Sequence, residues 1–168
     1  GLFQVAKDTG QSFDTVAKAA TEFSRQGLGA VETLKRTKDA LILTRLSGLD
    51  AAEAVKSLTV IQNTFTKESI DSTTALNKLA AVDAKFAVST RDLAEALSRT
   101  GSAASDAGVQ FDELLAIVAA TAQTTGRAGS VLGNAYKTIF TRIGRPETLD
   151  TLEALGIAVR DLQGNTLP

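Results

Sequence analysis

Apolar residues recur at spacings of three and four along most of this chain, which is the pattern of helices that bury one face. The clearest case begins at Asp50 and Glu53, whose spacing is that of a capping box with Asp in place of the usual Ser or Thr. The apolar positions behind this start are Ala51, Ala54, Leu58, Ile61 and Phe65. Because the repeat lasts only two heptads, it favours a helix hairpin over a long coiled coil.

The same spacing predicts further helices on both sides, with short connections between them. Their predicted starts are Ser12, Val31, residues 69–72 and Ser89. The positions predicted to face inward are Phe13, Val16, Ala20 and Phe23, then Val31, Leu34, Leu41 and Ile42, then Leu76, Leu79, Val82 and Phe86, and then Leu93, Leu97 and Ala104. Short connections make consecutive helices antiparallel neighbours.

The C-terminal third is predicted to contain a helix, a glycine turn, a second helix, a short third helix and a strand. Residues 114–122 are almost wholly apolar and small, which favours a buried helix. The helix after the turn, at residues 130–143, is predicted to have one continuous apolar face formed by Leu132, Tyr136, Ile139 and Ile143. Pro146 suits the first position of the short helix. The residues that predict a strand entering a hairpin are Ile157, Val159, Gln163, Gly164 and Asn165.

These elements amount to about eight helices, with no strand before Ile157. We therefore expect an all-α fold, an array of antiparallel helix hairpins with a short C-terminal strand or hairpin. Residues 1–168 are expected to form one helical module, with a leading helix in 1–29, helix hairpins in 30–110 and the C-terminal elements in 111–168. No exact internal repeat is visible, which leaves a solenoid open. Because Met is absent, even at position 1, we expect the module to be a piece of a longer chain.

Composition narrows the function classes further. A net charge of −1 argues against a specific nucleic acid as the main partner, since phosphate binding needs clustered positive charge. The absence of Cys and His removes thiolate ligands, the commonest metal ligand and the commonest general base. Asp112 and Glu113 are interpreted as partners of a helix dipole, because neighbours on a helix point about 100° apart. We therefore predict a protein that is not an enzyme and that has no cofactor and no metal.

Basic residues cluster in one predicted helix, and we interpret them as part of a solvated face that also bears Asp39. The cluster consists of Lys35, Arg36, Lys38 and Arg45. Lys137 is likewise expected in solvent. Arg142 and Arg145 are predicted to hydrogen-bond the carbonyls at the end of their helix.

The glycines around residue 129 have two interpretations. A phosphate-cradling loop is disfavoured, because the Gly-Lys-Ser/Thr ending is missing and no strand precedes it. Gly129 and Gly133 also form a GxxxG pair, which predicts close packing against another small-residue helix and leaves a membrane or oligomer contact open. The candidate packing or partner-contact residues are Gly126, Arg127, Gly129, Gly133, Asn134, Lys137 and Phe140.

A series of short motifs resembles the conserved core of phage tail tape measure proteins. The series begins with Asp83-Ala84-Lys85-Phe86-Ala87-Val88-Ser89-Thr90, Leu93-Ala94-Glu95-Ala96-Leu97, Gly108-Val109 and Phe111-Asp112-Glu113-Leu114-Leu115-Ala116. It is densest at Thr125-Gly126-Arg127, Gly129, Gly133-Asn134-Ala135, Lys137-Thr138-Ile139-Phe140 and Leu155-Gly156-Ile157. Each motif is weak alone, but together they are specific, and the resemblance extends from about residue 30 onward.

The resemblance implies a structural scaffold module that serves tail tube assembly, length control and genome delivery. It implies a place in the virion, in the lumen of the tail tube, and in the host cytoplasm during assembly. The implied partners are tail tube and tail tip proteins, tail assembly chaperones and further copies of the chain. Because the long heptad arrays of a ruler are missing, a compact module is favoured. The alternative hypothesis is a membrane-inserting, channel-forming module that meets the host envelope during DNA injection.

Overall fold

The computed structural model describes residues 1–161, which form helices joined by short connections. The helices are α1 Leu2–Thr9, α2 Phe13–Ser24, α3 Ala30–Ser47, α4 Ala51–Thr64, α5 Ser72–Lys85, α6 Thr90–Asp106, α7 Phe111–Thr125, α8 Gly129–Ile143 and α9 Pro146–Ala154, with a 3₁₀ turn at Thr66–Glu68. The prediction of an all-α fold is confirmed. No strand forms within residues 157–161, so the strand predicted to start at Ile157 is not seen there. The predicted turn at Gln163, Gly164 and Asn165 lies outside the described residues.

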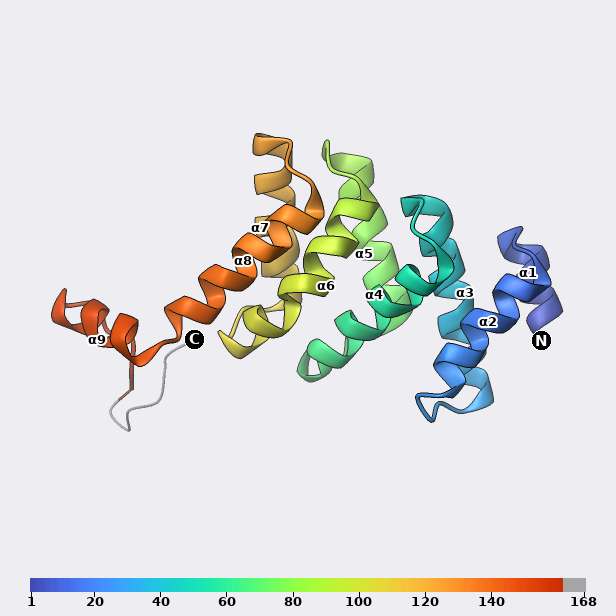
Figure 1. Cartoon of the computed structure of the whole chain (residues 1–168), viewed down its shortest axis with the longest axis horizontal. Coiled ribbons are helices and arrows are strands. Elements are labelled where there is room, and N and C mark those ends of the chain that lie inside the picture. Colours follow the sequence, from blue (N-terminus) through green and yellow to red (C-terminus); the bar gives the residue numbers. More distant parts are fainter. Residues whose placement is uncertain (162–168) are drawn as a thin grey trace.

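The helices pack in two layers that follow the order of the chain (Figure 1). In this view α2, α4, α6 and α8 lie side by side in front, and α3, α5 and α7 lie behind them. At one end of the array α1 contacts α2 and α3, and at the other end α9 contacts α8. Among the described residues, α6 and α8 make the most extensive contact of any two helices.

The array repeats with a regular period. The front helices α4, α6 and α8 begin at residues 51, 90 and 129, and the rear helices α5 and α7 begin at residues 72 and 111, so each step is 39 residues. Periods near 40 residues are typical of stacked helix pairs, in which each unit contacts mainly its neighbours. The structure is therefore a short solenoid, the arrangement that the sequence pattern alone left open.

Capping side chains set several of the helix starts. The predicted capping box of α4 is present, because the Glu53 amide donates to Asp50 Oδ1 at 2.8 Å and the Asp50 amide donates to Glu53 Oε2 at 3.0 Å. Asp71 and Ser89 accept amide hydrogen bonds in the same way at the starts of α5 and α6. These bonds satisfy backbone donors that no helical carbonyl can reach.

Of the inward positions predicted before residue 111, most are buried or half-buried and three are exposed. The buried core joins α2 to α8 and includes Phe23, Leu41, Leu58, Phe65, Leu79, Leu93, Leu97, Phe111 and Leu114. Phe86 was expected inside but is 47% exposed, because it follows the last turn of α5 beside a groove that no helix fills. Phe13 and Val31 are also exposed, at the end of the array where only the short α1 covers α2 and α3.

Asp39 is buried, which corrects its predicted place on a solvated face. The first turn of α5 packs against α3 at this point, and the hydroxyls of Ser72 and Thr73 donate to Asp39 Oδ2 at 2.6 and 2.8 Å. A buried carboxylate is tolerated when hydrogen bonds replace its water. Asp39 therefore fastens α3 to α5.

Candidate functional site

Two glycines of the densest motifs, Gly129 and Gly133, lie where α6 crosses α8. A Cβ atom added at Gly129 would lie 2.0 Å from the carbonyl oxygen of Asp92, and one added at Gly133 would lie 2.8 Å from Arg99 Cβ and 2.9 Å from the carbonyl oxygen of Ala96. These contacts are shorter than van der Waals separation, and most involve backbone atoms that cannot rotate away. The two backbones therefore touch, which only glycine at both positions permits.

The side chain of Asp92 joins the first turns of the two helices. Its Oδ1 accepts a hydrogen bond of 2.6 Å from the amide of Gly129, and its Oδ2 accepts one of 2.5 Å from the hydroxyl of Ser89. Gly129 is the first residue of α8, so its amide has no partner within that helix. Asp92 lies against Gly129, and Ala96, one turn later in α6, lies against Gly133, one turn later in α8, so the two helices run parallel. α7 connects them in the sequence.

The other candidate residues surround this crossing without joining it. Gly126 ends α7 in the left-handed conformation, with φ of 63°, and its amide donates to the carbonyl of Ala122. Arg127 and Asn134 are exposed. Lys137 is exposed as predicted, and it lines a shallow groove of about 590 Å³ between α6 and α8 together with the half-buried Phe140.

The apolar face predicted for α8 is only half covered. Leu132 is buried and Tyr136 is half-buried, with its hydroxyl bonded to Thr121 of α7. Ile139 and Ile143, however, are 52% and 46% exposed. The predicted continuous face therefore splits, because no helix in the described part of the chain covers its C-terminal half.

Positive charges are distributed unevenly over the array. The basic cluster of α3 is paired: Lys35 with Asp71, Arg36 with Glu32 and Lys38 with Asp8, while Arg45 donates to the carbonyl of Thr9. Between α6 and the start of α9, five basic side chains form no ion pair and no hydrogen bond with any group in residues 1–161. They are Arg99, Arg127, Lys137, Arg142 and Arg145. The predicted bonds from Arg142 and Arg145 to helix-end carbonyls are thus not formed.

The pairing of Lys35 with Asp71 shifts both groups. The ammonium of Lys35 lies 2.6 Å from Asp71 Oδ2, and the hydroxyl and amide of Thr74 also bond this carboxylate. These contacts lower the pKa of Asp71 to about 2. The same ion pair raises the pKa of Lys35. Because Asp71 also caps α5, the pair ties the start of that helix to α3.

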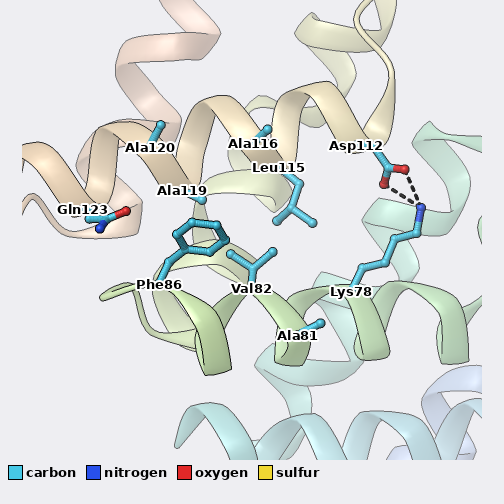
Figure 2. A pocket seen from close by; sticks show the side chains of 10 residues that line it. All are labelled: Lys78, Ala81, Val82, Phe86, Asp112, Leu115, Ala116, Ala119, Ala120 and Gln123. Atoms are coloured by element: carbon cyan, nitrogen blue, oxygen red, sulfur yellow. Dashed lines mark hydrogen bonds and ion pairs between the residues drawn. The ribbon is translucent and has the colours of Figure 1, made fainter.

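A second, more apolar groove of about 460 Å³ lies between α5 and α7 (Figure 2). Val82 and Phe86 point from α5 toward Leu115 and Ala119 of α7, and the ion pair of Lys78 with Asp112 lies at one end. Asp112 is therefore engaged by a lysine of another helix, while Glu113 accepts from the amide of Gln110 at the start of α7. Neither carboxylate faces a second one across a cleft.

The sequence pattern identifies the two glycines but does not single out Asp92. Nothing in the spacing shows that this carboxylate bonds an amide 37 residues later in the chain. Within residues 1–161, no cluster of three acidic, histidine or cysteine side chains could hold a metal ion. No helix in the same range is long and apolar enough to cross a membrane.

The comparison with protein families gives a match over nearly the whole chain. The family model described as phage-related minor tail protein matches residues 3–168. No solved structure matches the chain. Because the match covers nearly the whole sequence, the chain belongs to the family of phage-related minor tail proteins, a family of structural proteins associated with the virion.

Proposed function

We propose that this chain is a scaffold module of a tape measure protein and serves tail tube assembly, length control and genome delivery. One observation supports the proposal: two glycines of the motifs that resemble tape measure proteins lie at the α6–α8 crossing. Gly129 and Gly133 belong to those motifs, and both are required for the closest helix contact in the array. The resemblance thus includes residues that determine the shape of the module.

In this proposal the module acts as a compact unit. A continuous helix lengthens by about 1.5 Å for each residue, whereas a folded array of helix pairs adds much less length for the same number of residues. A compact module therefore contributes little to a ruler by its own extension. It contributes by presenting a fixed surface during assembly, to tail tube and tail tip proteins, to tail assembly chaperones or to other copies, in the lumen of the tube.

An in-frame deletion of residues 30–160 in the parent particle tests this role, with tails imaged by electron microscopy. We expect absent tails, or tails of normal length that fail to deliver DNA. Tails shortened by roughly 200 Å would instead identify the segment as an extended spacer, because that is about 1.5 Å for each deleted residue. Normal tails with normal infectivity would overturn the proposal.

A matched pair of glycine substitutions avoids the drastic change of a deletion. Gly133→Ala forces α6 and α8 apart, whereas Gly101→Ala adds a methyl group 3.5 Å from the side chains of Thr64 and Phe65, which is ordinary contact. If the shape of the module matters in the particle, the first variant reduces the yield of infectious particles and the second leaves it unchanged. Equal yields from a Gly133→Ala protein whose α8 is shown to be displaced would contradict the proposal.

A further inference from the structure

The outer flank of α8 lacks the cover that the same positions have in the two preceding repeat units. Ile139 and Ile143 stand 39 residues after Thr100 and Ala104, and 78 residues after Ile61 and Phe65. All four earlier residues are almost completely buried, and Phe65 packs against Phe111 of α7 with the ring centroids 5.3 Å apart. Ile139 and Ile143 are about half exposed. The 39-residue repeat of helix starts therefore includes α8, but the side chains at these two positions of α8 have no helix of residues 1–161 packed over them.

The neighbouring turn of α8 shows the same interruption. Ala135 is exposed, whereas the equivalent Ser57 and Ala96 are buried. Ala135, Ile139 and Ile143 follow one another at intervals of four residues, so they form one ridge along the helix. α9 does not cover this ridge, because it is only nine residues long and makes only a slight contact with α8.

Three arginines lie on α8 or close to its ends. Arg142 lies one turn beyond Ile139, Arg127 precedes α8, and Arg145 follows it. None of the three pairs with a carboxylate within residues 1–161, and the sequence contains no Asp or Glu from residue 114 to residue 146. A helix that continued the array here would meet an aliphatic ridge with an arginine on the same helix and one beyond each of its ends.

We propose that the ridge of Ala135, Ile139 and Ile143 is a docking surface for an amphipathic helix that carries carboxylates beside an aliphatic stripe. Such a helix would continue the packing already established between α4 and α6 and between α6 and α8. Its apolar stripe buries the two isoleucines, and its carboxylates pair with Arg142, Arg145 and Arg127. The opposite end of a second copy fits these charges less well, because residues 1–29 carry three basic and three acidic side chains.

The full chain can be tested with two synthetic peptides of about 20 residues, long enough to form a helix on the surface. Both have the same leucine stripe, but one has glutamates beside it and the other has lysines. Fluorescence anisotropy should show that the glutamate peptide binds at least tenfold more tightly than the lysine peptide. The two peptides binding equally would overturn the proposal, because charge would then play no part.

Variants of the chain locate the bound peptide. Ile139→Glu should abolish binding, and Arg142→Glu combined with Arg145→Glu should weaken binding of the glutamate peptide by about tenfold. The matched controls are Val31→Glu, an exposed aliphatic residue on α3, and Lys56→Glu, an exposed lysine on α4. Both controls should bind like the unchanged chain. Equal losses in the controls would place the peptide elsewhere and overturn the proposal.

Two further measurements distinguish other occupants of the same surface. If sedimentation shows a dimer of the chain that Ile139→Glu dissociates, a second copy covers the ridge and the proposed acidic helix is wrong. If vesicles containing phosphatidylglycerol bind the chain but not the Ile139→Glu variant, the surface meets a membrane instead. A monomer that ignores the vesicles and binds the glutamate peptide supports the proposal. These measurements use the isolated chain, so their outcome does not depend on its role in the tail.

Discussion

The two crossings between front helices, α4 with α6 and α6 with α8, occupy equivalent places in the repeat but differ in what fills the contact. At the first crossing, Gly101 faces the side chains of Phe65 and Thr64 at 3.5 Å. At the second, Gly129 and Gly133 bring backbone against backbone, and a carboxylate of one helix bonds the first amide of the other. The more extensive contact is thus made by the residues with the least side-chain surface.

This difference shows how a solenoid can vary its tolerance to substitution while keeping its period. A contact between side chains can adjust by changing rotamers, whereas a contact between backbones cannot. We therefore expect an alanine at Gly129 or Gly133 to displace the whole of α8. An alanine at Gly101, in the α4–α6 crossing, should be accommodated by small side-chain shifts.

The largest effect is expected for Gly129→Ala. The added methyl group would overlap the backbone carbonyl of Asp92, which lies 2.0 Å away, so α8 must shift and lose the Asp92 hydrogen bond as well. We expect the free energy of unfolding to fall by about 3 kcal/mol or more, measured by urea denaturation. Unchanged stability would mean that the two backbones are not in contact.

The next effect comes from Gly133→Ala, with Gly101→Ala as its control. At Gly133 the nearest atoms are Arg99 Cβ and backbone atoms of Ala96, at 2.8 to 3.0 Å, and we expect a loss of about 2 kcal/mol. At Gly101 the methyl group fits, and alanine favours a helix interior by up to about 1 kcal/mol, so stability should stay level or rise. Equal losses at both positions would remove the distinction between the crossings.

A smaller loss is expected for Asp92→Ala, which leaves the amide of Gly129 without its acceptor. Removing such a cap costs about 1 to 2 kcal/mol. Asp92→Asn keeps an oxygen that can accept this bond, so its loss of unfolding free energy should be less than half of the loss in Asp92→Ala. If the two variants unfold at the same urea concentration, the bond to Gly129 contributes nothing measurable.

The smallest effect concerns the ion pair of Lys35 with Asp71 in the other part of the array. Asp71 has a pKa of about 2 in the folded chain and an ordinary value of 3.8, so its contribution is complete above pH 4 and is lost as the pH falls through 2. The pair is partly exposed, and we expect Asp71→Asn to cost less than about 1 kcal/mol at pH 6. The stability difference between Asp71→Asn and the unchanged chain should vanish below pH 2, and a difference that persists there would point to lost helix capping instead.

Periodicity was sufficient to predict the all-α fold and most of the core, since apolar spacing and caps are local signals. The 39-residue repeat is not visible in the sequence because equivalent positions share burial rather than identity: Val55, Ala94 and Gly133 are one such set. Pro146 does begin α9, as its place in the sequence predicts. Local patterns thus locate helices but not the order in which they stack.

The errors have a common physical origin, which is contact between distant segments. The sequence predicts a solvated Asp39, but the first turn of α5 buries it and supplies two hydroxyl donors. Phe86 and Ile143 have the spacing of buried residues, but no described helix covers them. The two glycines were recognised from their spacing, whereas the partner helix and the role of Asp92 depend on the tertiary structure.

Hydrogen exchange of the backbone amides in Gly133→Ala and Gly101→Ala tests most directly whether the glycine contact holds α8 on the array. Gly133→Ala should lose protection throughout Gly129–Ile143 while α4 and the first part of the array keep theirs, and Gly101→Ala should match the unchanged chain. Unaltered protection of α8 in Gly133→Ala, or the same loss in both variants, would show that this crossing is not held by its backbone contact.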